Sequence, residues 1–420
     1  MLNKLQNEGR NSLIFILLII MMAALFFSRA ALSVSMISFV AVSFFHKDTK
    51  KQFHEFLGSP LLWGMSLLFF LPLLSGLWSE EGKAWTEILR IKLPLLFLPV
   101  AFAAPFKFSQ RQWEWVAYSF MALITAGTIW SMYHYVANAA VINESYLQAK
   151  SLVTPLENDH VRFSWLISVA ILTGGILILI KKHSQKRIAL VLAIIILWLI
   201  IFLHLLAART GLFSLYIILL TGSLWLIFKR WNPASIGRPY GVLLLILLAA
   251  SPFVAYKTLP TFQNRVKYIL HDFGYFKEAH YLQGANDAVR IISLKAGYSL
   301  IKEYPLRGTG FGDLNTATRK WYDLHYPQMA EPDKIFPSSE WLIYGAACGI
   351  PGFLVFSLVM IIPFFIKTKA MVLWRTLNLI TAFSFLFDIG LEVQFGVFIY
   401  AFIILVFWKW VTYGIAPDPQ

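Results

Sequence analysis

The sequence predicts an all-α membrane protein with about twelve transmembrane helices and one large polar loop between the ninth and the tenth. Of its 420 residues, 58% are hydrophobic and only 14% are charged, whereas a soluble domain carries about 25% charged residues. Aromatic residues make up 16% of the chain, which is typical of proteins whose rings lie in lipid and at the headgroup boundary. Together these observations argue against a water-soluble fold.

The predicted spans are apolar runs that reach, or nearly reach, the length needed to cross a bilayer. In chain order they cover about 12–27, 31–45, 60–78, 93–104, 113–136, 163–180, 188–206, 210–228, 240–256, 341–366, 373–387 and 393–410. The fourth run is short and interrupted by proline. The chain therefore divides into 1–256 with helices one to nine, 257–338 with the loop and its short helices, and 339–420 with helices ten to twelve.

The formal net charge of +14 could suggest a nucleic-acid partner. Where the charges lie along the chain shows whether such a partner is needed to explain them. If the N-terminus is cytoplasmic, the cytoplasmic connections and tails hold half of the 36 basic residues but only five of the 22 acidic ones. The positive-inside rule accounts for this asymmetry. We therefore predict cytoplasmic termini, membrane lipids as surroundings, and no nucleic acid. The first run could be a cleaved signal peptide, but further spans follow at once, which favours an uncleaved helix.

Four segments on the opposite side of the membrane are unusually polar. Residues 78–92 have the pattern of an interfacial amphipathic helix, and 137–162 form a polar connection. The other two segments are the large loop over 257–338 and a short acidic turn at 388–392. In the large loop, 286–303 have helical spacing, and 304–312 end that helix in a Gly-rich turn. The turn lacks the Gly-Lys-Ser/Thr sequence of a nucleotide-binding loop.

Two arginines stand out on this side. Arg209 lies in a very short connection between two apolar runs, where a charge is costly unless it reaches water or has a partner. Arg290 lies near the start of the loop helix and could simply be solvated. Two arginines above the membrane plane could also hold a diphosphate through bidentate, charge-assisted hydrogen bonds.

The histidines do not predict a metal site. His160, His271, His280 and His325 lack the spacing of zinc ligands, so we expect no metal. His325 is the one nearest the return into the membrane, and it is either a surface histidine or a general base.

The remaining polar and reactive groups have two interpretations each. Asp388 and Glu392 are spaced to share one face if their turn is helical, and carboxylates so close to lipid either pair with a cation or take part in catalysis. Cys348 is the single cysteine, which excludes an intrachain disulfide and favours a small buried side chain over a reactive thiol.

The layout and several local motifs resemble the O-antigen ligase family. Arg-Thr-Gly at 209–211 resembles the family's short Arg-containing connection. Arg290 followed by the turn 304–312 resembles the Arg-helix-Pro-x-x-Gly-x-Gly pattern of its large loop. The other matching segments are 75–78, 89–99, 159–164 and 344–352.

The resemblance implies a GT-C-like membrane enzyme of the bacterial inner membrane that uses no cofactor, metal or nucleotide. Such an enzyme transfers a glycan from an undecaprenyl diphosphate carrier to a sugar hydroxyl on lipid A-core at the periplasmic face. Arg209 and Arg290 match the two arginines that hold the diphosphate in the family. The substrate would also meet secondary groups, which we expect to be Lys92, His160, Arg162, Arg265 and Glu392.

One position departs from the family pattern. Where family members commonly have Pro-His-Asn ahead of the tenth span, this chain has Pro337-Ser338-Ser339. Because serine cannot act as a general base, the expected base must be Glu340, His325 or Glu392, or the transition state needs little help from a base.

Two alternatives remain open. An O-antigen polymerase would use the same chemistry but extend the carrier-linked glycan, whereas a ligase forms a lipid A-linked product. A non-enzymatic transporter or flippase would move lipid-linked sugar without a covalent product. Transporters usually place polar groups at mid-membrane in broken helices, whereas polar residues here gather at span ends and in one loop.

Overall fold

The computed structural model describes residues 2–181, 185–228, 237–277 and 286–414, and it contains seventeen α-helices and no β-strand within these ranges. The predicted all-α membrane architecture is confirmed. Each of the twelve apolar runs coincides with a helix. These helices are α1 (Leu2–Phe27), α2 (Arg29–Ser43), α4 (Pro60–Ser75), α5 (Gly82–Phe102), α6 (Gln110–Ala137), α8 (His160–Lys181), α9 (Lys186–Leu206), α10 (Arg209–Phe228), α11 (Gly237–Thr258), α15 (Glu340–Ile361), α16 (Met371–Phe385) and α17 (Gln394–Lys409).

Fewer helices have the length and composition of a membrane span than there are apolar runs in the sequence. Eight helices in the described ranges are long and apolar enough to cross a membrane, and a ninth crossing results if α3 (Thr49–Gly58) and α4, bent by 83° at their junction, count as one. Helices α2 and α16 have 15 residues each, which is shorter than a hydrocarbon core about 30 Å thick requires. The protein is therefore polytopic, and the exact number of twelve spans stays a prediction.

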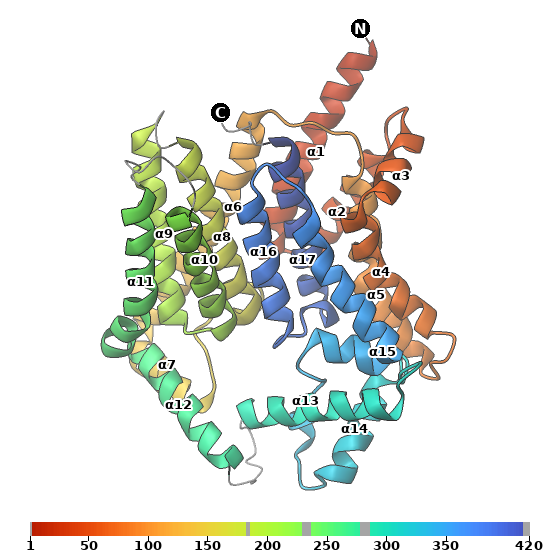
Figure 1. The fold of residues 1–420 in the computed structure, drawn as a ribbon, viewed down its shortest axis with the longest axis vertical. Helices are drawn as coiled ribbons and strands as arrows, with labels where there is room; N and C mark the ends of the chain where they lie inside the picture. The colour runs from red at the N-terminus through yellow and green to blue at the C-terminus, as the bar shows by residue number, and fades with distance from the viewer. Residues whose placement is uncertain (1, 182–184, 229–236, 278–285, 415–420) are drawn as a thin grey trace.

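The bundle is built around α17. In its most apolar stretch 89% of the residues are buried, compared with 11% in α11 at the edge. Figure 1 shows the start of α1 and the end of α17 at one end of the bundle, while the large loop covers the other end. The loop contains α12 (Pro260–Lys277), α13 (Asn286–Glu303) and α14 (Leu314–His325), and the short helix α7 (Ala139–Ser145) lies beside α12. The predicted loop helix over 286–303 is confirmed.

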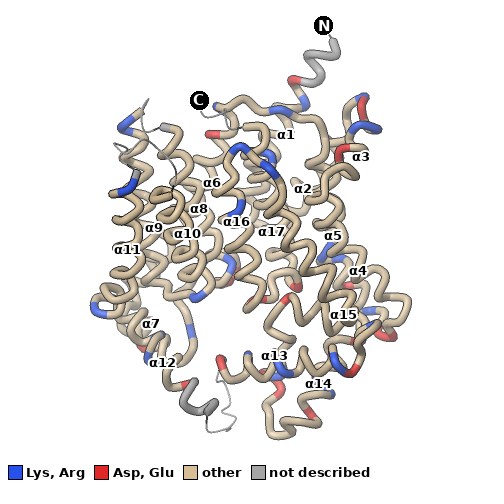
Figure 2. Tube along the Cα trace, in the orientation of Figure 1, with Lys and Arg blue, Asp and Glu red and all other residues tan. Residues whose placement is uncertain are grey.

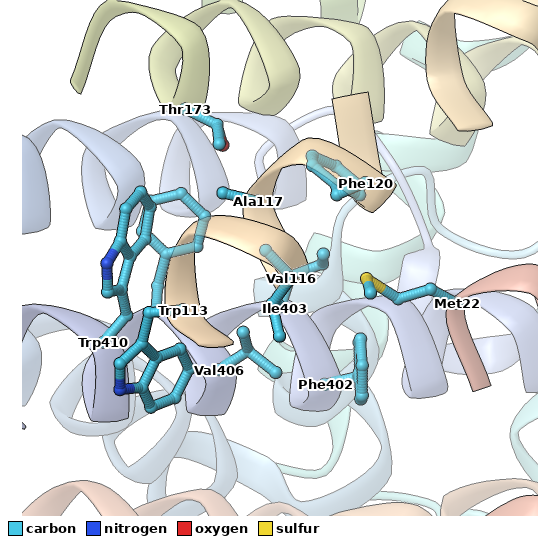
Figure 3. A pocket seen from close by; sticks show the side chains of 11 residues that line it. Met22, Trp113, Val116, Ala117, Phe120, Thr173, Phe402, Ile403, Val406 and Trp410 are labelled. Carbon is cyan, nitrogen blue, oxygen red and sulfur yellow. The ribbon is translucent and has the colours of Figure 1, made fainter. Parts of the chain in front are cut away.

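Charged and apolar side chains occupy different parts of this bundle. Most charged residues lie toward its two ends or in the loop, as Figure 2 shows. Figure 3 shows a small pocket between α1, α6, α8 and α17 that is lined by apolar side chains and Thr173. Since no charged side chain lines this pocket, we interpret it as a gap in the packing of the helices. A candidate catalytic or binding site is expected at the loop end of the bundle, where charged residues lie.

Helix α5 corrects one expectation. The interfacial helix predicted over 78–92 and the short fourth span are a single helix that continues through Pro94 and Pro99. A proline lacks the N–H that would bond to the carbonyl four residues earlier. For Pro99 that carbonyl belongs to Leu95, and the Ser66 hydroxyl donates to it at 3.1 Å. A side chain of α4 thus replaces a lost backbone bond, which the sequence of α5 alone does not reveal.

Helix α15 is broken, and the Gly-rich turn of the loop fills the break. Gly349 has a φ of +69°, which favours glycine. Its neighbour Ile350 donates its N–H to the Pro305 carbonyl at 2.8 Å. In return, Thr309 and Gly310 donate their N–H groups to the carbonyls of residues 346 and 347. The turn 304–312 therefore docks on a kinked helix through backbone hydrogen bonds, in agreement with its interpretation as a helix-terminating turn.

Candidate functional site

Arg209 is placed by a tight connection between α9 and α10. Ala207 adopts a left-handed conformation with φ +47° and ends α9, so that α10 begins two residues later at Arg209. A side chain at Gly211 would collide with Ser164, because a Cβ there would lie 2.5 Å from the serine Cβ. Helices α10 and α8 can therefore approach closely, and Arg209 lies where they meet the loop.

Arg209 has a partner from the loop. Its Nη2 lies 2.5 Å from Oδ1 of Asp287, whose side chain is only 7% exposed, while Arg209 itself remains 38% exposed. Asp287 lies in the first turn of α13, and its backbone N–H donates to Asp272 of α12 at 2.7 Å. Because residues three apart lie on one face of a helix, Arg290 projects from the same face as Asp287. An ion pair thus brings the two arginines from distant parts of the chain to one place.

Burial and the neighbouring cations lower the pKa of Arg290, and the Arg209 guanidinium is the first of these cations. The carboxylates of Asp388 and Asp287 oppose this shift. The pKa of Arg265 is lowered in the same way, mainly by burial and also by Arg209. These guanidinium groups are therefore within electrostatic reach of one another, and a bound anion would relieve their repulsion.

Several groups that were expected to bind the substrate beside Arg209 and Arg290 already contact other residues of the protein. Arg265 is buried under the ring of Tyr146 and donates to the Lys150 carbonyl and the Ser151 hydroxyl at 2.8 and 2.9 Å. Arg162 donates to Asp159 at 2.6 Å and to Asp388 at 3.4 Å. The half-buried His160 at the start of α8 lies within electrostatic reach of both Arg265 and Arg290. A small pocket lined by Arg162, Thr210, Asp388 and Tyr400, among others, opens between α8, α10, α16 and α17.

Lys92, Glu340 and Glu392 form a second, closed cluster. Lys92 Nζ lies 2.7 Å from Glu392 Oε1, and their side chains are 0% and 8% exposed. Glu340 is fully buried and accepts a hydrogen bond of 2.5 Å from the Leu391 N–H. The expected pairing of Asp388 and Glu392 with cations is confirmed. The two carboxylates do not share an α-helical face, because residues 390–392 form a 3₁₀ turn, and each contacts a different cation.

Their burial corrects the expected role of Lys92 and Glu392. The sequence suggested that both meet the substrate, but the Lys92 ammonium is inaccessible and donates to Glu392 and to the Leu391 carbonyl. Glu340, a candidate general base, is equally inaccessible. A base must reach the proton that it removes, so this arrangement suits none of the three for direct contact with an acceptor sugar.

Ser338 and His325 occupy different surroundings. Ser338 is buried, and its hydroxyl lies 2.9 Å from that of Ser293 on α13, so it fastens the loop helix to the start of α15. His325 lies at the exposed end of α14, stacked on Trp321 at a ring distance of 4.5 Å, with Nδ1 2.9 Å from the Trp321 carbonyl. The described contacts of His325 join it to its own helix and not to either arginine. His280 lies outside the described residues.

Other expectations concern metals and the cysteine. In the described ranges no group of three or more His, Cys, Asp or Glu side chains could hold a metal ion. Cys348 is buried in α15 next to the break, as its interpretation as a small core residue predicted. Sequence reasoning missed Asp287, although its position three residues before Arg290 could have identified it as a partner for a second arginine.

Comparison with known protein families gives one match. Residues 194–357 match the Wzy_C family model, described as O-antigen ligase. This match supports an assignment to the O-antigen ligase family. The matched segment contains Arg209, the large loop, Arg290 and the break in α15. No curated protein sequence matches the chain. The family implies an enzyme of the glycosyltransferase type that transfers glycans as O-antigen ligases and polymerases do.

Proposed function

We propose that this chain transfers a glycan from an undecaprenyl diphosphate carrier to lipid A-core or another sugar acceptor at the periplasmic face of the bacterial inner membrane. The observation that carries this proposal is the meeting of Arg209 and Arg290 through Asp287 at the loop end of the bundle. Several guanidinium groups within electrostatic reach of one another, one of them partly exposed, at the level where the bundle ends, suit a lipid-linked diphosphate.

In this reaction the acceptor hydroxyl oxygen forms a bond to the anomeric carbon while the bond from that carbon to the diphosphate oxygen breaks. Negative charge grows on the departing diphosphate, and the two guanidinium groups would stabilise it by hydrogen bonds that strengthen as the charge develops. The hydroxyl proton must also leave. Since Glu340 is buried, Glu392 pairs with Lys92 and His325 stacks on Trp321, we favour a transition state that depends more on the arginines than on a base.

The test uses a ligase-null strain complemented with the chain, and the readout is the lipopolysaccharide gel profile. We expect Arg209→Ala and Arg290→Ala each to reduce transfer by about 100-fold or more, the cost of removing a preorganised oxyanion donor. Arg90→Ala is the matched control, because Arg90 is exposed and its ion pair among the described residues is with Glu87 in the same helix. If both arginine variants transfer glycan like the wild type, the site assignment is wrong.

A polymerase is the second candidate, and Ser338 is the observation that favours it. The family pattern has histidine there, whereas this chain has a serine that is already engaged with Ser293. A different residue at this point is compatible with a different acceptor. Product analysis separates the two functions: lipid A-linked glycan indicates the ligase, and longer carrier-linked chains indicate the polymerase.

A further inference from the structure

We propose that Glu340 is a positioning residue: it fixes the 387–392 segment, and through that segment it holds Arg290 and Arg162 in place for the diphosphate. The inference rests on the proposed function and extends it to a residue that contacts no substrate. The 387–392 segment joins α16 to α17, and only its last three residues form a 3₁₀ turn. Its conformation therefore depends on side chains from other helices.

Charged side chains from four helices hold this segment. Arg290 of α13 donates to the Phe387 carbonyl at 3.4 Å. Arg162 of α8 donates to the Asp388 carboxylate at 3.4 Å and to the carbonyl of residue 389 at 3.3 Å. Lys92 of α5 and Glu340 of α15 hold its other end. Among the described contacts, residues 387–392 thus form the backbone segment to which all four of these charged side chains bind.

Glu340 and Lys92 hold Leu391 from both sides. The Leu391 N–H donates to Glu340 Oε1 at 2.5 Å, and the Leu391 carbonyl accepts from Lys92 Nζ at 2.9 Å. All three groups are buried, so water cannot replace either bond. The Lys92 ammonium also faces the rings of Phe311 and Tyr344 at 5.3 and 5.1 Å. Phe311 belongs to the Gly-rich turn, so the same lysine links the segment to the large loop.

A change at Leu391 would affect Arg290, because the two ends of the segment are only a few residues apart. Leu391 is fixed, and four residues earlier Phe387 presents its carbonyl to Arg290. If Leu391 is released, the carbonyls of residues 387 and 389 lose their fixed positions, and the guanidinium groups of Arg290 and Arg162 lose the acceptors that orient them. Glu340 therefore acts on the diphosphate through the backbone and not by touching it.

Replacing Glu340 by glutamine distinguishes this positioning role from general-base catalysis. Glu340→Gln keeps an oxygen that accepts from the Leu391 N–H but removes the basic carboxylate, whereas Glu340→Ala removes both. We expect Glu340→Gln to keep kcat/KM for the carrier-linked donor within about threefold of the wild type. Glu340→Ala should lower it about tenfold or more, mainly through KM of the donor. Glu87→Gln, an exposed change on α5, is the control.

A second measurement does not depend on transfer. Amide hydrogen exchange in full-length protein in detergent should be faster across 387–392 in Glu340→Ala than in the wild type, by about tenfold or more, and nearly unchanged in Glu340→Gln. The wild type could transfer no glycan to any acceptor while the two variants still show this exchange pattern. In that case the proposed function fails, but the role of Glu340 in fixing residues 387–392 stands. Circular dichroism and thermal unfolding establish that each variant is folded.

Two results would overturn the proposal. A folded Glu340→Gln protein that is as inactive as Glu340→Ala would show that the carboxylate itself is required. A Glu340→Ala protein with wild-type donor KM and unchanged exchange in 387–392 would show that the segment does not depend on Glu340. Binding of undecaprenyl diphosphate, used alone as the probe, should weaken in Glu340→Ala in parallel with the donor KM.

Discussion

The arginine cluster and the Lys92 cluster lie at the same end of the bundle but differ in exposure and charge balance. Arg209 is 38% exposed and forms an ion pair with Asp287, whereas Lys92 is fully buried and the side chain of Glu392 is 8% exposed. The first cluster contains Arg162, Arg209, Arg265 and Arg290 beside four aspartates, and the second contains one lysine beside two glutamates. An open cluster with several guanidinium groups can bind a ligand, while a closed and saturated one can only hold backbone.

The strongest test of this contrast removes the closed cluster's cation. Lys92→Met would leave two buried glutamates without their lysine, and breaking a buried pair in this way typically costs about 3–5 kcal/mol. We therefore expect a large drop in thermal stability in detergent. Lys83→Met on the same helix is the matched control, because Lys83 is exposed. Equal unfolding temperatures for the two variants would show that the Lys92 cluster does not stabilise the fold.

A weaker effect is expected from the ion pair that joins the two arginines. Asp287→Ala would release Arg209 from α13, and we expect glycan transfer to fall by about three- to tenfold, as charge-assisted hydrogen bonds of about 1 kcal/mol imply at a partly exposed site. Asp287→Asn should cost less, since its amide oxygen still accepts from Arg209. The donor KM measures the effect. Faster transfer by Asp287→Ala would instead mean that Asp287 competes with the diphosphate for Arg209.

The smallest effect concerns Ser338, which lies between the two clusters. Ser338→Ala removes the hydrogen bond between the two hydroxyls, leaves the one from the backbone N–H of residue 338 to the Ser293 hydroxyl, and should lower the unfolding free energy by about 1 kcal/mol. A double-mutant cycle with Ser293→Ala measures the coupling, and the thermal midpoint gives the readout. Additive losses would indicate that the two hydroxyls do not stabilise the protein through each other.

Much of the architecture could be predicted from apolar periodicity. All twelve runs are helices, and the loop helix over 286–303 has the predicted bounds, because helix formation and burial in lipid depend mainly on local composition. The boundary at residue 92 was wrong, because α5 is one helix that continues through Pro94 and Pro99. At Pro99, Ser66 of a neighbouring helix bonds to the carbonyl that the proline leaves free. Local patterns contain no information about such a partner.

The site divides in the same way. The residue types and their side of the membrane identified Arg209 and Arg290, since a charge in a short connection between apolar runs needs a partner or a ligand. The position of Asp287 three residues before Arg290 offered a signal, but its pairing with Arg209 and the distinction between exposed and buried cations depend on the tertiary structure. Lys92 and Arg209 look alike as cations next to apolar runs, yet only packing against Phe311, Tyr344 and Glu392 removes Lys92 from solvent.

The sequence by itself determined a polytopic helical protein with a polar loop and two candidate arginines, because hydrophobicity and charge asymmetry act through the bilayer and not through specific neighbours. Only the tertiary structure decided that Asp287 joins those arginines, that Ser338 fastens α13 to α15, and that Glu340 holds Leu391. Each of these contacts joins residues that are between 45 and 78 positions apart. Such contacts form only when the helices pack, and no local sequence pattern specifies which distant residue will form the contact.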